Sequence, residues 1–245
     1  MNELRALLAD TTEKVLSTLP KDEAVAWKAI HDAGLANVLV PEADGGFGGG
    51  WEDAFIVLRA TGLHATPIAL AEAIAEPGLK NASTETRFDR MALARACQMA
   101  GAMQAALDLS VQYTRERQQF GKALSTFQAI QQQLALFAEE TAATNMAAIA
   151  ACRAADRGDA VFEIASAKLR ANMAVSTSTS VAHQVYGAMG FTSEYGLHHF
   201  TRRLWEWRSE YGNDRYWADR LGALVAANGA AGFWPALVNP ATIRA

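Results

Sequence analysis

The sequence predicts an all-α fold, with an N-terminal helical segment followed by a C-terminal bundle of the four-helix type. Six of the 245 residues are proline, at positions 20, 41, 67, 77, 235 and 240, and none lies between Pro77 and Pro235. Because proline removes a backbone donor and breaks helices, this interval leaves room for long ones. Apolar side chains recur there at steps of three and four residues, and alternating β patterns of useful length are absent.

This spacing and the turn residues divide the chain into eight expected helices. One apolar series runs through Leu93, Cys97, Ala100, Met103, Leu107 and Val111. Ser125 is the expected N-cap of the fifth helix, Gly158 follows the end of that helix, and Asp159 can cap the next one. The helices are expected near residues 2–18, 22–33, 51–75, 88–118, 125–157, 160–186, 195–207 and 213–228.

A glycine-rich stretch and a short polar junction interrupt the helices. Residues 41–50, which begin with Pro41-Glu42 and carry glycines from position 45 onward, form a loop on any interpretation. The stretch follows no strand and lacks the Lys-Ser/Thr pair of a P-loop, so an ordinary turn is favoured over a phosphate loop. The junction 77–87 predicts two domains, a helical one over 1–80 and a bundle over 81–245.

Composition excludes several classes of function. Hydrophobic residues make up 51% of the chain and charged residues 20%, with a formal net charge of −4, which is typical of a soluble globule. No run of Lys or Arg forms a basic stripe, so we expect no nucleic-acid partner. No apolar run approaches the roughly 20 residues that span a bilayer, and the charged first residues do not resemble a signal peptide. We therefore expect a cytoplasmic protein with no membrane partner.

The residues that most often bind metals give no metal site. Cys97 and Cys152 lie far apart in helical patterns and are expected to be small buried apolar side chains. His198 and His199 are adjacent, so on a helix they point in different directions and make a poor metal pair.

The stretch from Tyr113 to Lys122 combines a cation, an aromatic ring and a glycine at the end of a long apolar helix. Arg117 offers a planar guanidinium suited to a diphosphate, Phe120 can lie against a ring, and Gly121 allows a close backbone approach. The alternative from local chemistry alone is a helix C-terminus with a favourable arginine and a stop glycine.

Three stretches together resemble one family. Arg117-Gln-Gln-Phe120-Gly121, followed by Phe127-Gln128, resembles the Arg-x-x-Phe-Gly…Phe-Gln signature of acyl-CoA dehydrogenases. The stretch from Gln184 through Gly187, Ala188, Gly190 and Phe191 to Glu194-Tyr195 resembles the Gln-x-x-Gly-Gly-x-Gly-Phe…Glu-Tyr segment of the same family. Val40-Pro41-Glu42…Gly45-Gly46-Phe47-Gly48 resembles the family's N-terminal loop, so the resemblance covers nearly the whole chain.

The resemblance implies an FAD site shared between subunits. In the family the flavin ring rests on a middle β domain, and the diphosphate and adenosine reach the C-terminal helices of the neighbouring subunit. The positions here that match those partner-side contacts are Arg117, Phe120, Gly121, Gln128, Gln184, Gly187 and Ala188. A cation for the diphosphate, amides for hydroxyls and glycines for close approach suit that role. Ala188 replaces a family glycine, and its methyl group is expected to crowd the nucleotide.

Two departures from the family pattern change what the chain can do alone. About a dozen residues separate the N-terminal helices, which run to about Ala75, from the bundle near Phe88. A small barrel needs several strands of roughly five or six residues each, so the middle β domain is missing. The family's glutamate base falls on Tyr211 here, with Glu210 one residue away. The alternative base position of isovaleryl-type members falls on Met91, and the arginine that follows it there falls on Ala92.

Three hypotheses follow. The first is an FAD-sharing subunit of a heteromeric acyl-CoA dehydrogenase without its own base; residues 201–208 resemble the unequal subunits of bacterial steroid side-chain enzymes. The second is a self-sufficient enzyme that uses Glu210, and the third is a helical scaffold or regulator without FAD. The family resemblance implies an acyl-CoA substrate, electron-transfer flavoprotein as acceptor, and a dehydrogenase-like partner in an α2β2 or homo-oligomeric assembly.

Overall fold

The computed structural model describes residues 3–79, 82–192 and 194–238, and the regular secondary structure in these ranges is helical apart from one small hairpin. The prediction of an all-α fold is confirmed. The helices are α1 (Glu3–Ser17), α2 (Glu23–Asp32), α3 (Trp51–Leu63), α4 (Leu70–Ala75), α5 (Thr84–Glu116), α6 (Gln128–Arg157), α7 (Val161–Tyr186), α8 (Leu197–Ser209) and α9 (Asp214–Val238). Short 3-10 turns η1 to η5 occupy Leu35–Asn37, Glu42–Asp44, Pro77–Leu79, Leu124–Thr126 and Gly187–Phe191.

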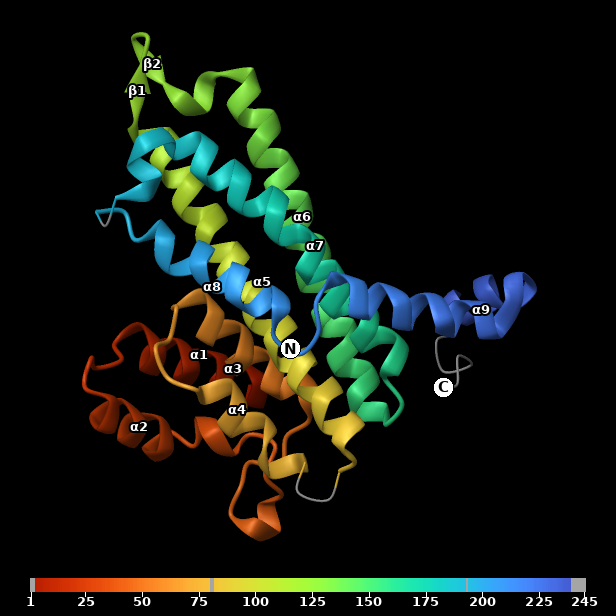
Figure 1. The fold of residues 1–245 in the computed structure, drawn as a ribbon. Helices are drawn as coiled ribbons and strands as arrows, with labels where there is room; N and C mark the ends of the chain where they lie inside the picture. Colours follow the sequence, from red (N-terminus) through yellow and green to blue (C-terminus); the bar gives the residue numbers. More distant parts are fainter. Residues whose placement is uncertain (1–2, 80–81, 193, 239–245) are drawn as a thin grey trace.

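Helix α5 is the central helix of the molecule. The Ser83 hydroxyl caps it by accepting from the Thr86 amide at 3.1 Å, and it packs against α3, α4, α6, α7 and α8 (Figure 1). Its crossing with α3 brings the two backbones into contact at glycines. A Cβ on Gly101 would lie 1.9 Å from the Arg59 carbonyl oxygen, and one on Gly62 equally close to the Gln98 oxygen. Only glycine permits this crossing.

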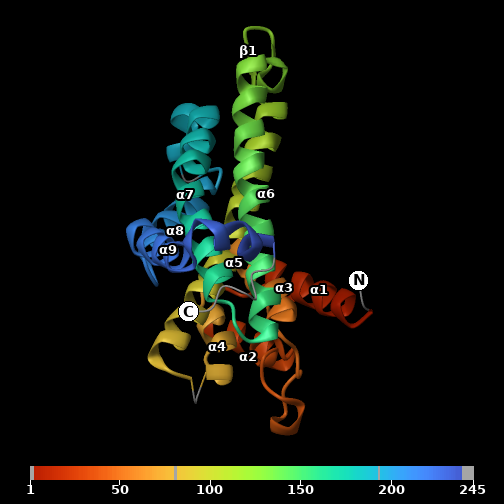
Figure 2. The ribbon, with the colours of Figure 1, turned by 90° about the vertical axis from the view of Figure 1, so that its right-hand side faces the viewer.

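Two hydrophobic cores lie along α5. The lower core joins α1, α3 and α4 to the near ends of α5, α6 and α7, so the N-terminal helices and the bundle share buried side chains. The upper core joins α5, α6, α7 and α8 around Met103, Phe137 and Val175. Figure 2 shows α5, α6 and α7 rising together from the N-terminal helices, which cover one end of the bundle.

The expected single helix over 51–75 is wrong, because the chain breaks after Leu63. Ala65 adopts a left-handed φ of 46°, and the Thr66 amide turns back to the Thr61 carbonyl at 2.9 Å. Pro67 follows and has no backbone N–H to continue a helical ladder. Helix α4 then begins at Leu70, which places its short axis against α5.

The expected caps around α6 are partly correct. Ser125 is not the N-cap, because it lies inside the 3-10 turn η4 and α6 starts after Phe127. Gly158 does end the helix, with a φ of 113° that a side chain would resist. Asp159 lies just before the start of α7, where its carboxylate accepts from the Val161 amide at 3.4 Å.

The segment between α4 and α5 is too short to hold a middle β domain. Eight residues separate the end of α4 at Ala75 from the start of α5 at Thr84, and three of them form η3. The described residues contain one two-stranded sheet, β1 (Gln118–Gln119) against β2 (Lys122–Ala123), which the helical periods did not predict. The expected boundary between residues 80 and 81 lies outside the described residues. Among the described helices, none combines the length and apolar character needed to cross a membrane.

Candidate functional site

The first candidate segment is the β1–β2 hairpin at the far end of α5. Gln118 pairs with Ala123 and Gln119 with Lys122, so Phe120 and Gly121 form a two-residue turn. Both have left-handed φ values, 52° and 78°, as tight hairpin turns require. A left-handed conformation is uncommon for a bulky side chain. It leaves Phe120 91% exposed, in edge contact with the Phe127 ring at 6.2 Å.

Arg117 lies at the junction of α5 and this hairpin. Its backbone amide donates to the Tyr113 carbonyl at 2.8 Å, and its carbonyl accepts from the Leu124 amide at 2.9 Å, so its position is fixed from both sides. Its side chain is exposed, and across the described ranges its guanidinium has no hydrogen bond or ion pair. The amide of Gln128, in the first turn of α6, is exposed as well. The end of α5 and the start of α6 therefore present a cation and an amide to solvent.

The second candidate segment is the end of α7. Gln184 and Ala188 are exposed, and Gly187 ends the helix with a φ of 58°. A Cβ on Gly187 would meet nothing within 4 Å, so the backbone there is open to a close approach from outside.

A stacked tyrosine pair brings the two segments to one end of the bundle. The Tyr113 and Tyr186 rings lie parallel with centroids 4.1 Å apart, and the Tyr186 hydroxyl donates to the Leu109 carbonyl at 3.0 Å. Burial raises the pKa of Tyr186 to about 12, so its hydroxyl keeps its proton and this bond near neutral pH. The hairpin and the end of α7 consequently lie at the same end of the molecule (Figure 1).

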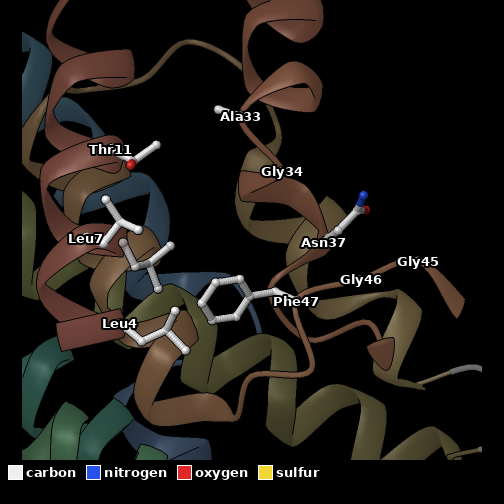
Figure 3. A pocket seen from close by; sticks show the side chains of 10 residues that line it. Leu4, Leu7, Thr11, Ala33, Gly34, Asn37, Gly45, Gly46 and Phe47 are labelled. Atoms are coloured by element: carbon white, nitrogen blue, oxygen red, sulfur yellow. The ribbon is translucent and has the colours of Figure 1, made fainter. Parts of the chain in front are cut away.

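The glycine-rich loop lies at the opposite end, beneath the N-terminal helices (Figures 1 and 2). Phe47 from this loop points toward Leu4 and Leu7 of α1 across a hollow of about 310 Å³ (Figure 3). Gly46 lies against Val40, where a Cβ would come within 2.1 Å of the Val40 carbonyl oxygen. These glycines permit a tight turn. Within this chain the loop lies apart from the hairpin and from the end of α7.

These groups fit part of a dinucleotide. We call the set Arg117, Phe120, Gly121, Gln128, Gln184, Gly187 and Ala188 the bundle-end surface. A free guanidinium suits a diphosphate, free amides suit hydroxyls and phosphate oxygens, and the open backbone at Gly187 admits close contact. The described residues hold no sheet that could support a flavin ring, so the fit covers the diphosphate half only.

Glu210 lies elsewhere, at the end of α8, which runs from the bundle end toward the middle of the molecule (Figure 1). Its carboxylate forms an ion pair with Arg95 of α5 at 2.6 Å. Arg95 is 7% exposed and makes a second 2.6 Å pair with Glu72 of α4. Its guanidinium also donates to the Gln98 side chain and lies 5.3 Å from the Trp207 ring centroid. The Glu210 carboxylate is therefore already engaged by a side chain of its own chain.

The other two base positions carry no carboxylate. Tyr211 has a left-handed φ of 51° and meets the Phe88 ring edge-on at 6.1 Å. Burial raises the pKa of its hydroxyl, so it stays protonated near neutral pH. Met91 is 6% exposed and Ala92 is fully buried, so both are part of the lower core.

Two buried cations near Glu210 were not singled out from the sequence. Lys168 of α7 is fully buried, and its ammonium donates to the carbonyls of Trp207, Arg208 and Gly212 and to the Asn172 side chain at 2.6–3.3 Å. It thereby holds the turn that carries Glu210 and Tyr211. The signal that could have found Arg95 and Lys168 is a charged residue at an apolar position of a helical pattern.

In the part of the chain that the structure describes, no three His, Cys, Asp or Glu side chains gather as a metal site would require. His198 and His199 lie in the first turns of α8, with ring centroids 4.0 Å apart. Cys97 and Cys152 are both fully buried, as expected, but they are neighbours in space, with Sγ atoms 3.6 Å apart and no disulfide.

Comparisons with known proteins show which family this chain resembles in sequence. Residues 78–208 match the acyl-CoA dehydrogenase C-terminal domain family. The probable acyl-CoA dehydrogenase FadE25 of Mycobacterium leprae is 35% identical over 131 residues, which are 53% of this chain and 34% of that protein. The mitochondrial short-chain specific acyl-CoA dehydrogenase of Bos taurus is 31% identical over 176 residues, 68% of this chain and 42% of that protein. The chain thus matches about a third of the length of the first of these curated relatives.

Solved structures share the fold. A variant of the Tcur3481–Tcur3483 steroid ACAD superposes with a TM-score of 0.82 at 18% identity, covering 93% of this chain and 99% of that one. The ChsE4–ChsE5 complex from Mycobacterium tuberculosis gives a TM-score of 0.79 at 16% identity, with coverage of 93% and 97%.

Proposed function

This chain belongs to the acyl-CoA dehydrogenase family, and from that premise we propose that it is the FAD-sharing subunit of a heteromeric acyl-CoA dehydrogenase. Its role is to hold the diphosphate half of an FAD whose ring is supported by the partner subunit. The observation that carries the proposal is a division within the chain: the Arg117 guanidinium is free at the bundle end, whereas Glu210 is held by Arg95.

The bundle-end surface would hold the cofactor through Arg117 at the diphosphate, with the Gln128 and Gln184 amides at hydroxyls and phosphate oxygens. The exposed Phe120 ring and the open backbone at Gly121 and Gly187 support a close approach. When bound, FAD supplies the hydride acceptor for α,β-desaturation of an acyl-CoA thioester. The methyl group of Ala188 is exposed on the same surface, where it is expected to crowd the nucleotide.

The catalytic base is proposed to belong to the partner. Breaking the Arg95–Glu210 pair would leave a buried guanidinium with less compensation, which costs several kcal/mol for fully buried pairs. Glu210 itself is 43% exposed, so the cost here is smaller, but its carboxylate is already engaged by Arg95. Tyr211, Met91 and Ala92 add no carboxylate.

The proposed assembly is an α2β2 complex, with electron-transfer flavoprotein as the electron acceptor. The structural likeness to the Tcur3481–Tcur3483 steroid ACAD and to the ChsE4–ChsE5 complex supports an unequal partner. A homo-oligomer is the alternative that co-purification would reveal. The proposed location is the cytoplasm, where Cys97 and Cys152 would remain thiols.

Arg117→Ala tests the cofactor contact. Loss of a charge-assisted pair costs about 1.5–3 kcal/mol, so the complex should bind FAD about ten- to a hundredfold more weakly while still assembling. Equilibrium titration of the apo-complex with FAD measures this. Arg115→Ala is the matched control, because Arg115 is an exposed arginine one half-turn away on α5. Equal FAD affinity in both variants contradicts the proposed contact.

Glu210→Gln tests where the base resides. Turnover of acyl-CoA by the complex should stay within a few-fold of the parent, because the partner's carboxylate does the proton transfer. The self-sufficient enzyme predicts the reverse: retained FAD and a fall of about a hundredfold or more for a missing base. A chain that stays colourless with every co-expressed partner would instead be the helical scaffold.

A further inference from the structure

The two cysteines of the chain are neighbours in the lower core, and neither belongs to the bundle-end surface. Cys97 lies on α5 and Cys152 on α6, and both side chains are fully buried. Their Sγ atoms are 3.6 Å apart, close enough for a hydrogen bond between the thiols, and both thiols are free. Two residues 55 positions apart in the sequence are therefore brought together by the packing of α5 on α6.

Contacts other than the thiols hold α5 and α6 in this arrangement. The Arg90 guanidinium of α5 donates to the carbonyls of Ala155 and Gly158 at the end of α6, at 3.3 and 3.1 Å. Asp156, one turn beyond Cys152, accepts from two backbone amides at the start of α3. The end of α6 is thus fixed to two other helices, and the two sulfurs stay close whether or not a bond joins them.

The gap between the sulfurs is small compared with the reach of the two side chains. A disulfide bond is about 2.05 Å long, so the sulfurs would have to approach each other by about 1.5 Å. Rotation of the two side chains about their Cα–Cβ bonds can move each sulfur by part of this distance. The pair can therefore become a disulfide while α5 and α6 keep their packing.

Burial decides which oxidants can react with the pair. It raises the pKa of the Cys152 thiol, and the hydrogen bond with Cys97 adds to this effect. Because the thiolate is the nucleophile, reaction is slow and the pair stays reduced under ordinary conditions. Bulky or charged oxidants are excluded from fully buried sulfurs. Hydrogen peroxide is small and uncharged, and it can reach them during brief local openings of the core.

We propose that Cys97 and Cys152 form a site of oxidative modification, at which hydrogen peroxide converts the two thiols into a disulfide that joins α5 to α6. One sulfur, as the thiolate, attacks a peroxide oxygen and the O–O bond breaks. This gives a sulfenic acid and a hydroxide, which leaves as water with the thiol proton. The second sulfur attacks the sulfenic sulfur, the S–S bond forms, and the hydroxyl group leaves as another water. The thiols lose two electrons and peroxide gains them.

The disulfide would close a loop that contains the bundle end of α5, the β1–β2 hairpin and most of α6. Such a cross-link limits the freedom of the unfolded chain, so the oxidised chain should unfold at a higher temperature than the reduced chain. The segment that carries Arg117 and Gln128 would then be tied at its base. A dithiol reductant reverses the bond by thiol–disulfide exchange. The site does not depend on the proposed sharing of FAD.

The test treats the folded full chain with hydrogen peroxide, after removal of reductant, and counts free thiols in denaturant. The chain has two cysteines, so the count should fall from two to zero and return to two with dithiothreitol. Mass spectrometry should find a peptide pair cross-linked through Cys97 and Cys152. The cross-linked pair is measured in place of the whole-chain mass, because exposed methionines such as Met146 also gain oxygen. The melting temperature should rise by several degrees relative to the matched control.

Cys152→Ala is that control, because it keeps Cys97 and removes its neighbour, and Cys97→Ala is the reciprocal variant. In either one, peroxide should give no cross-link within the chain and no rise in melting temperature. Thiols of the parent that survive while Met146 is oxidised would overturn the site. So would sulfinic acid in place of the cross-linked pair, a disulfide between two chains, or a disulfide that forms only in urea. A disulfide that forms without raising the melting temperature would contradict the stabilising cross-link.

Discussion

Lys168 is a charged side chain enclosed by protein, and it gives the fold a pH dependence. Its ordinary pKa of 10.5 is lowered to about 7, first by burial and then by the charge of Arg95. Between these values the unfolded chain binds a proton that the folded chain lacks. The free energy of unfolding therefore rises with pH across this window and is lowest below pH 7.

Replacement of Lys168 by methionine should remove this rise. From pH 7 to pH 9 the parent should gain about 1–3 kcal/mol of stability relative to Lys168→Met, measured by urea unfolding at each pH. Lys28→Met is the control, because the Lys28 ammonium is 74% exposed at an i,i+4 pair with Asp32. A constant difference between parent and Lys168→Met at both pH values would show that the buried amine keeps its charge.

At the residue scale the sequence indicates which side chains could contact a cofactor. It does not indicate which charged side chains pair with each other inside the chain. The bundle-end residues could be proposed from the sequence because their motif is local, within a few positions of a helix end. The Arg95–Glu210 pair joins residues 115 positions apart, and it depends on where α8 ends against α5. No helical period carries that information, since the packing of whole helices decides it.

The crossing of α3 and α5 is the tightest contact between elements. Gly101→Ala places a methyl group 1.9 Å from the Arg59 carbonyl oxygen and 2.8 Å from the Leu63 amide, so one helix must move. Such overpacking typically costs about 1–3 kcal/mol, which lowers the melting temperature by roughly 2–10 °C for a chain of this size.

Gly222→Ala is the matched control within α9, because a Cβ there would meet nothing within 4 Å. It should leave the melting temperature unchanged or raise it, since alanine is about 1 kcal/mol better than glycine in a helix. Thermal unfolding followed by circular dichroism compares the two variants. Equal melting temperatures would mean that α3 and α5 do not cross at these glycines.

At the element scale the 3.6-residue period located α5, α6 and α7 within a few residues at each end. The period gave a wrong result around Pro67. The apolar pattern continues there, but the helical backbone is interrupted by a turn. It also missed the β1–β2 hairpin, because two-residue strands are too short to show alternation. Both errors lie at turns, where the backbone conformation of a single residue decides the local structure and the apolar pattern does not.

The outer face of α6 is the proposed assembly surface of the whole molecule. Leu136 is 53% and Met146 61% exposed, and they lie within about a quarter-turn of each other on α6. Small residues between them, Ala142 and Ala143, are exposed as well and would allow a second helix to approach. We propose that oligomers form through this face; Met173 of α7 is a further exposed apolar side chain, at 53%.

Met146→Arg should weaken assembly by at least about tenfold, because a charge would be desolvated at the centre of an apolar contact. Sedimentation velocity at micromolar concentration, with the partner present, measures the effect. Val25→Arg is the control, an equally exposed apolar residue at 52% on α2, far from α6 in sequence. An unchanged assembly for Met146→Arg would exclude this face.

The whole-molecule architecture is the level at which sequence and structure agree most closely. The absence of a middle β domain was predicted by counting residues between two helical patterns, and eight residues lie there between α4 and α5. The shared lower core was not predicted, because it requires α1, α3 and α4 to pack against the bundle directly. The direction of α9, which projects away from the bundle in Figure 1, was not predicted either.

The central claim, that FAD is held jointly by this chain and a partner subunit, is tested most directly by flavin content. This chain, the partner and the co-expressed pair are each purified, and bound flavin is measured from the absorption spectrum and protein concentration. The account predicts a colourless chain when it is alone, and a yellow complex in which both subunits co-purify with FAD. FAD bound by this chain alone, together with turnover of acyl-CoA, would contradict it.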